Sequence, residues 1–344
     1  MPRVSVVVPT YNRAHLLRTC LESIARQTYR DFEIVVVDDG SADNTAEVVA
    51  AFAPLARYFW QENQGIPGAL NRGVREAGGE YVSFVASDDA LVPEALEAEV
   101  QVLEENPCVG LVYGQAWEMN EKGRVISLRK PGFAQGSYIR SGREEIRDLL
   151  FADHITCSTV MVRRSSLDDV GLFDLEYSPL GEDWEMWTRI AKKYDVAYIA
   201  KPLGIYLDHA GPAGNIYSRI DPWTLERLRR LYVEQVIQDP EIGHLYQGLR
   251  GKAFARHHRV VATRAYQARE MGLARSHIRR ALRARPREFL GRKGLAMAWL
   301  FLGTWIPVPA LRAGRVMMRV LRDWVFGRRF SAKAVIRPQG EKMG

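Results

Sequence analysis

Cysteine is scarce in this sequence. The 344 residues include only Cys20, Cys108 and Cys157, which are widely spaced and odd in number. That pattern fits neither a disulfide framework nor a cysteine-based zinc site. The opening MPRVSVVVPT also lacks the charged, apolar and small-residue succession of a secretory signal. We therefore expect a protein of the reducing cytoplasm, with no indication of export.

Long apolar runs are lacking as well. A spanning helix needs about 20 predominantly apolar residues, whereas residues 294–310 form an uncharged run of 17 that contains Pro307 and Pro309 near its end. A membrane span is therefore not favoured. The following residues 311–330 alternate apolar side chains and arginines, a basic amphipathic pattern suited to a membrane interface. A core helix packed on the rest of the tail is the alternative.

Acidic residues are rare in the last part of the chain. From Arg250 onward there are 23 Lys or Arg against 4 Asp or Glu, a net charge of +19. The first 249 residues hold 25 against 37, a net charge of −12. A cationic tail on an acidic body indicates that the tail binds a polyanionic surface. Tryptophans within the tail favour an anionic membrane over nucleic acid as that surface.

Apolar runs that end at acidic residues organise the first half. Residues 4–8 (VSVVV), 34–37 (IVVV) and 81–85 (YVSFV) are typical of buried strands, and the segments between them have helical periodicity. This order predicts an α/β fold with a mainly parallel sheet. Asp38 and Asp39 follow the second run directly, and two further aspartates follow the third. Ligands bind at such carboxyl ends, although an aspartate there can also cap a helix.

The remaining candidates are individually weak. Residues 114–155 have few long apolar runs, so we expect an irregular region over the site that governs acceptor choice. The segment GEDWEMW begins a helix at Gly181, where Asp183 alone could serve as an N-terminal cap. His209 follows a strand-like stretch, where a lone histidine is more often structural.

Five segments in chain order resemble one enzyme family. They are VSVVVPTYNR, EIVVVDDGSADNT, NQGIPGALNRG, GEYVSFVASDD and GEDWEMWTRI. Over roughly residues 4–210 this order is similar to the family 2 glycosyltransferases, inverting enzymes of the GT-A fold. The resemblance implies metal-dependent transfer of a sugar from a nucleotide-sugar donor to a hydroxyl group.

The resemblance also assigns the donor site. Pro9 and Tyr11 match the loop that packs by the nucleotide base, and Asp39 matches the acid that reads the base. Asp88 and Asp89 match the acids that contact the ribose and hold Mg2+ or Mn2+ against the diphosphate. The position two before Asp88 is an alanine, where many members have a further aspartate. Which of the two acids binds the metal therefore stays open.

The catalytic base comes from the family's Glu-Asp motif. Asp183 matches the general base on the acceptor hydroxyl, and Glu182 beside it is assigned to substrate binding. His209 lies where several members place a histidine near the metal and the diphosphate. A single displacement with one base gives inversion, and no Ser-His or Cys-His pairing argues for a covalent intermediate.

The expected partners follow from these assignments. They are a UDP-, GDP- or dTDP-sugar donor, a glycan or lipid-linked acceptor in cell-envelope synthesis, and the inner membrane face, bound peripherally through the tail. We do not expect nucleic acid. A sugar-phosphate nucleotidyltransferase and a non-catalytic nucleotide-sugar or glycan-binding protein of the same fold are the alternatives.

The sequence predicts three parts. Residues 1–215 form the catalytic domain, with a donor half at about 1–113 and an acceptor half at 114–215. Residues 216–290 form a helical extension without a repeat period. Residues 291–344 form the basic tail that associates with the membrane.

Overall fold

The computed structural model describes residues 2–209 and 219–286. The chain divides into two compact units, residues 1–253 and 254–344. Within the described residues, no helix is both long and apolar enough to cross a membrane. The predicted basic tail lies outside the described residues.

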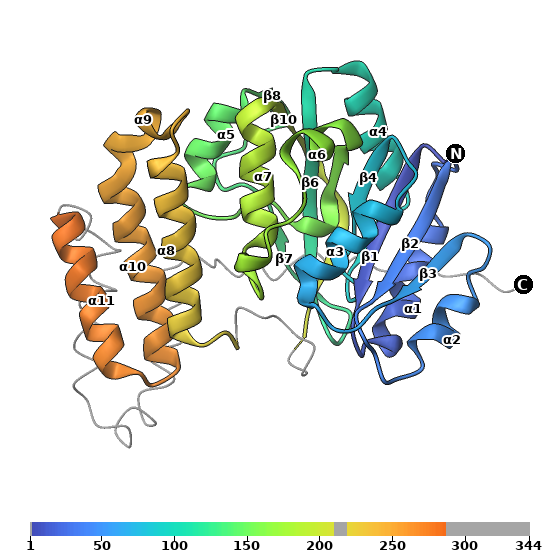
Figure 1. The fold of residues 1–344 in the computed structure, drawn as a ribbon, viewed down its shortest axis with the longest axis horizontal. Coiled ribbons are helices and arrows are strands. Elements are labelled where there is room, and N and C mark those ends of the chain that lie inside the picture. Colours follow the sequence, from blue (N-terminus) through green and yellow to red (C-terminus); the bar gives the residue numbers. More distant parts are fainter. Residues whose placement is uncertain (1, 210–218, 287–344) are drawn as a thin grey trace, which may run out of the picture. The chain divides into compact units, whose positions relative to one another are not determined.

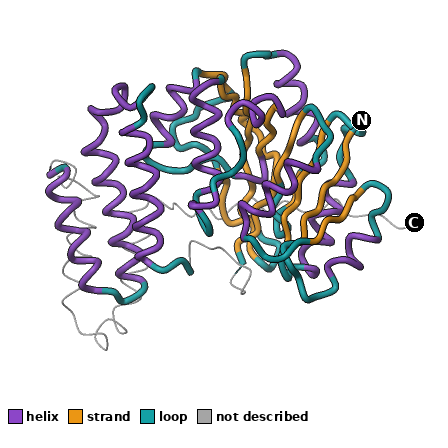
Figure 2. Tube along the Cα trace, viewed as in Figure 1, coloured by secondary structure: helices purple, strands orange, loops and turns teal. Residues whose placement is uncertain are grey.

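A mixed sheet forms the centre of the first unit, with its strands in the order β3-β2-β1-β4-β9-β6-β10-β5 and with β7 and β8 paired to β6 and β10 (Figures 1 and 2). The strands are β1 (Val4–Thr10), β2 (Phe32–Asp38), β3 (Ala56–Trp60), β4 (Tyr81–Phe84), β5 (Ala90–Leu91), β6 (Val109–Asn120), β7 (Val125–Arg129), β8 (Tyr138–Arg140), β9 (Val160–Arg163) and β10 (Asp195–Asp208).

The first four long strands run in one direction. β1 pairs in parallel with both β2 and β4, and β2 pairs in parallel with β3. β9 then joins β4 and β6 as an antiparallel strand, and β6 pairs in parallel with β10. The predicted α/β class is confirmed. The parallel alignment brings the carboxyl ends of β1, β2 and β4 to one edge of the sheet.

Helices cover both faces of this sheet (Figure 1). The helices of the first unit are α1 (Ala14–Ala25), α2 (Thr45–Ala50), α3 (Gly65–Glu76), α4 (Ala95–Glu105), α5 (Gly142–Leu149), α6 (Arg164–Val170), α7 (Glu182–Lys193), α8 (Pro222–Gln238) and α9 (Gly243–Tyr246). α1, α2 and α4 share one apolar core with alternate residues of β1 and β2. On the opposite face α3 lies so close to β1 that a Cβ at Gly73 would overlap Val7, and Trp187 of α7 contacts Phe84 of β4.

The region expected to be irregular is partly ordered. Residues 114–155 include the second half of β6, the hairpin partner β7, strand β8 and helix α5. The prediction failed because β7 and β8 owe their structure to pairing with β6 and β10, which leaves little periodicity in the local sequence.

Two helices follow the sheet-bearing part. α10 (Arg250–Gln267) starts in the first unit, and α11 (Met271–Ala284) lies in the second. Both lie within the segment predicted to be a helical extension. α8 and α9, within the predicted helical extension, belong to the first unit.

One buried carboxyl group lies in the α4 core with no hydrogen-bond partner among the described residues. Glu99 is 0% exposed, neither of its carboxylate oxygens is bonded, and burial raises its pKa to about 8. In the unfolded chain the carboxyl group of Glu99 ionises near its ordinary pKa. The folded state therefore retains a proton that the unfolded state loses, and stability falls as the pH rises from about 4.5 to 8.

We expect Glu99→Gln to stabilise the protein increasingly across this pH window. The glutamine carries no ionisable group, so its advantage should grow by roughly 1.4 kcal/mol per pH unit and level off above pH 8. Urea unfolding at pH 5, 6.5 and 8 measures this difference. Glu94→Gln, at an exposed position just before the same helix, is the control. A constant difference between wild type and Glu99→Gln at all three pH values would contradict this explanation.

Candidate active site

A cavity of about 400 Å³ opens where β1, β2 and α3 meet. Its lining combines the turn after β1 with the turns after β2 and β4. The lining residues are Pro9, Thr10, Tyr11, Asn12, Arg13, Asp39, Ile66, Ala69, Ala86 and Ser87. The structure thus brings together three of the predicted donor-site residues, Pro9, Tyr11 and Asp39. Tyr11 is 49% exposed, so its ring is available to a ligand.

Asp39 organises the rear wall of this cavity. Its carboxylate accepts hydrogen bonds from the backbone amides of Gln64 and Gly65, at 2.9 and 2.8 Å, and from the side-chain amide of Gln61 at 2.7 Å. These bonds fix the loop that leads into α3. The neighbouring Asp38 turns inward and accepts bonds from the Tyr58 hydroxyl and the Ser41 amide, so Asp38 shapes the turn.

Asp88 lies between two basic side chains that are distant in sequence. Arg13 Nη1 is 3.1 Å from Asp88 Oδ1, and His209 Nε2 is 3.0 Å from Asp88 Oδ2. Arg13 comes from the end of the β1 turn, and His209 follows β10. The structure therefore brings two of the three predicted metal ligands, Asp88 and His209, into direct contact.

Asp89, the third predicted ligand, is buried and directed differently. Its carboxylate accepts hydrogen bonds from the Ser158 hydroxyl and from the Leu207 amide, the latter at 3.1 Å. Burial, followed by the negative charge of Asp88, raises the pKa of Asp89 to about 7. Burial and the charge of Asp88 thus favour the protonated form of the Asp89 carboxyl group.

A second cavity of about 210 Å³ adjoins the first. Both cavities are lined by Pro9, Ile66 and Ala86. The second one also contains Asp89 on one side and Asp183 with Glu182 on another. Acids from the end of β4 and from the start of α7 therefore face one enclosed space, although about ninety residues separate them in sequence.

The start of α7 positions the acidic pair. Gly181 precedes the helix with a φ of +100°, a conformation that favours glycine. Asp183 Oδ1 accepts a 2.7 Å bond from the Trp184 amide. Burial raises the pKa of Asp183. Burial and then the charge of Asp183 raise the pKa of Glu182, which favours the protonated form of Glu182.

Two residues of this cavity were missed in the sequence. Asp153 lines it, and burial followed by the charge of Asp183 raises the pKa of Asp153 well above its ordinary value. Arg129, at the end of β7, lies over the Tyr206 ring with its guanidinium carbon 4.0 Å from the ring centroid. Its positive charge lowers the pKa values of Asp89, Asp153 and Asp183, although burial outweighs this effect.

The acids after β4 fit a divalent cation. A buried carboxyl group whose pKa is raised by a neighbouring carboxylate gains from a cation between the two, and carboxylate oxygens are the ligands that Mg2+ and Mn2+ prefer. Asp88 and Asp89 supply these oxygens, and His209 supplies a ring nitrogen next to them.

The fold is that of the GT-A glycosyltransferases. A crystal structure of S. aureus TarS 1-349 in complex with UDP-GlcNAc matches with a TM-score of 0.64 at 18% identity, covering 97% of this chain and 95% of that chain. The mannosyltransferase PcManGT from Pyrobaculum calidifontis, in complex with GDP-Man and Mn2+, matches with a TM-score of 0.57 at 22% identity, covering 94% and 83%.

The chain belongs to glycosyl transferase family 2, whose model matches residues 5–171. A PGL/p-HBAD biosynthesis glycosyltransferase of Mycobacterium tuberculosis is 34% identical over 189 residues, which cover 54% of this chain and 68% of that protein. An uncharacterized glycosyltransferase of Rickettsia felis is 32% identical over 195 residues, covering 56% of this chain. The match spans about a third of the Rickettsia protein, 32% of its length.

We expect Arg129→Met to destabilise the protein more at high pH than at low pH. Without the guanidinium, the carboxyl groups of Asp89, Asp153 and Asp183 hold their protons more strongly in the folded state, which costs stability once the unfolded chain ionises. The loss should be on the order of 1 kcal/mol at pH 8 and smaller at pH 5. Chemical unfolding at both pH values measures it.

Two controls separate charge from packing in this experiment. Arg129→Lys keeps the positive charge and should retain most of the stability at pH 8. Arg124→Met, at an exposed position of the same hairpin, should have no pH-dependent effect. An equal loss for Arg129→Met at pH 5 and pH 8 would contradict the electrostatic role.

Proposed function

We propose that this protein is an inverting glycosyltransferase that moves a sugar from a nucleotide-diphosphate sugar to a hydroxyl group of a glycan or lipid-linked acceptor. One observation carries the proposal. Asp89 and Asp183, the predicted donor-side acid and the predicted base, line one cavity, and that cavity shares walls with the larger one beside Tyr11. A donor in the larger cavity would thus present its sugar to the base.

The larger cavity suits the nucleotide part of a donor. Its volume of about 400 Å³ lies within the usual range of small-molecule sites. The exposed Tyr11 ring offers a stacking surface for a base, and Asp39 offers carboxylate lone pairs to its polar edge. The complexes of TarS with UDP-GlcNAc and of PcManGT with GDP-Man support a nucleotide-sugar donor.

Asp183 acts as the general base in this proposal. Its raised pKa brings the carboxylate closer to the pH at which a base works best. The group takes the proton of the acceptor hydroxyl as the oxygen attacks the anomeric carbon from the face opposite the leaving diphosphate. Glu182, whose raised pKa favours the protonated form, donates a hydrogen bond to the sugar or acceptor. One displacement of this kind inverts the anomeric configuration.

Asp88, Asp89 and His209 would hold Mg2+ or Mn2+ beside the donor diphosphate. A divalent cation there supplies positive charge that stabilises the leaving diphosphate. The Mn2+ in the PcManGT complex supports this assignment. Arg13, whose Nη1 lies 3.1 Å from Asp88 Oδ1, holds the carboxylate in place beside the larger cavity, which Arg13 lines.

Asp183→Asn tests the assignment of the base. We expect donor and metal binding to be retained while kcat falls by roughly 10² to 10⁴, the usual contribution of a general base. The assay uses a panel of UDP-, GDP- and dTDP-sugars with Mn2+, scored by transfer to an acceptor or by slow hydrolysis. Asp168→Asn, at an exposed position before α7, is the matched control.

Three outcomes would contradict this proposal. Unchanged turnover in Asp183→Asn would remove Asp183 as the base. Binding of a nucleotide-sugar without turnover, under every acceptor condition, would instead favour a non-catalytic binding protein of the same fold. Release of pyrophosphate from a nucleoside triphosphate would favour a sugar-phosphate nucleotidyltransferase.

We further propose that the protein acts peripherally on the cytoplasmic face of a membrane, on an acceptor of the cell envelope. The support is the net charge of +19 after residue 249 and the similarity to a glycosyltransferase named for PGL/p-HBAD biosynthesis. Basic residues near an anionic surface each contribute about 1 kcal/mol to binding.

Replacing four tail arginines by glutamine should therefore weaken binding of the full chain to anionic vesicles by at least 100-fold. The replaced residues are Arg312, Arg315, Arg319 and Arg322. Sedimentation with vesicles of anionic and of zwitterionic lipid measures the effect. A control variant neutralises four exposed arginines of the first unit. Its replaced residues are Arg18, Arg26, Arg30 and Arg124. Equal binding by both variants would contradict a role for the tail.

A further inference from the structure

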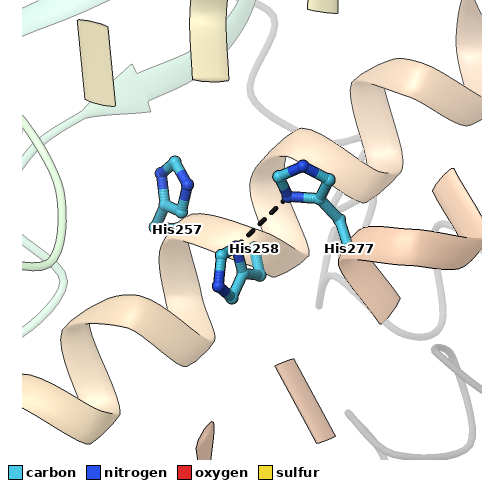
Figure 3. Close-up of side chains that lie close together, drawn as sticks. All are labelled: His257, His258 and His277. Carbon is cyan, nitrogen blue, oxygen red and sulfur yellow. Dashed lines mark hydrogen bonds between the residues drawn. The ribbon is translucent and has the colours of Figure 1, made fainter. Parts of the chain in front are cut away.

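A cluster of three histidines lies in the α10–α11 hairpin. His257 and His258 are neighbours on α10, and His277 is on α11 (Figure 3). One ring nitrogen from each lies within 4.8 Å of the other two. These three side chains lie close enough together to hold a metal ion. Neither the family match nor the proposed transfer reaction involves it.

The distances suit a tetrahedral site. Zinc binds imidazole nitrogen at about 2.0–2.1 Å, so two nitrogens on one tetrahedral zinc ion are roughly 3.3 Å apart. The Nδ1 atoms of His258 and His277 are 3.2 Å apart. Figure 3 shows these two rings facing each other, with the His257 ring beside them. A rotation of the His257 ring that moves its nitrogen by about 1.5 Å would bring all three ring nitrogens to the spacing of ligands on a tetrahedral ion.

Two of the three rings are shielded from water, and His258 is partly buried. His257 is 0% exposed and His277 is 1% exposed. Burial and the positive charge of Arg280 lower the pKa of His258 to about 4, and burial, His258 and Arg280 do the same for His277. Both rings are therefore neutral, the form in which imidazole binds metal. The positive charge of Arg280 disfavours a bound metal ion as it disfavours a bound proton. A metal ion, however, forms bonds to three ring nitrogens at once.

Apolar side chains of both helices are buried in the hairpin. They include Val261 and Ala265 of α10 and Leu273, Ala274 and Ile278 of α11. A metal ion bound by residues of both helices would add a strong link between them, because metal binding to a folded site contributes directly to folding.

We propose that His257, His258 and His277 bind one zinc ion that ties α10 to α11. Three imidazoles are a ligand set typical of zinc. A water molecule or another ligand takes the fourth position. The competing interpretation is a histidine pair joined by a hydrogen bond within a buried hairpin, and it predicts no metal binding.

Zinc titration of the full chain tests this proposal. The protein is purified without a polyhistidine tag, stripped with EDTA, and titrated with Zn2+ against a fluorescent zinc chelator in excess Mg2+. We expect one zinc ion per chain in the wild type, with affinity at least 100-fold lower in His258→Ala and in His277→Gln. His244→Ala, at an exposed position on α9, should bind as the wild type does.

Two further measurements distinguish zinc binding at the histidines from binding at the transfer site and from misfolding of a variant. Asp88→Asn combined with Asp89→Asn should leave zinc binding intact, because oxygen ligands of the transfer site are not involved. Co2+ added to the stripped wild type should give the intense visible absorption of tetrahedral cobalt, which requires no variant to fold. Absence of that absorption and of tight zinc binding in the wild type would overturn the proposal, as would retention of zinc by folded His258→Ala and His277→Gln.

Discussion

Four carboxyl groups meet in one small cavity, and burial raises the pKa of each of them. Asp89 comes from the end of β4, Asp153 from the segment after α5, and Glu182 and Asp183 from the start of α7. Their mutual repulsion and lost hydration cost free energy that the sheet and its helices must offset. Such crowding of titratable groups in a cleft is typical of a functional site.

The fold makes this crowding possible. β1, β2 and β4 are parallel and adjacent, so their turns share one edge of the sheet. The cores on both faces hold these strands rigidly, through α1, α2 and α4 on one side and α3 and α7 on the other. A rigid frame keeps the acids near one another when a flexible one would let them separate. The same frame brings Asp89 from the end of β4 and Asp183 from the start of α7 to one cavity.

The sequence contained enough information to predict the parallel strands of the first half and the turns that carry Pro9, Tyr11 and Asp39, because these depend on local apolar runs and on the residues that follow them directly. The GT-A fold was predicted from the resemblance of five motifs to a known family. The sequence did not reveal Arg129 or Asp153, because their places in the cavity depend on the pairing of β7 with β6 and on the path of the chain after α5. The contact between Arg13 and Asp88 depends in the same way on two separate turns meeting in space.

The central claim is that the acids after β4 hold a divalent cation against a donor diphosphate. Titration of Mn2+ followed by electron paramagnetic resonance, with and without UDP, GDP or dTDP, tests it most directly. The account predicts one Mn2+ per chain, bound at least tenfold more tightly with one class of nucleotide, and lost when Asp88→Asn and Asp89→Asn are combined. Mn2+ binding that no nucleotide strengthens, or that persists in the double variant, would contradict it.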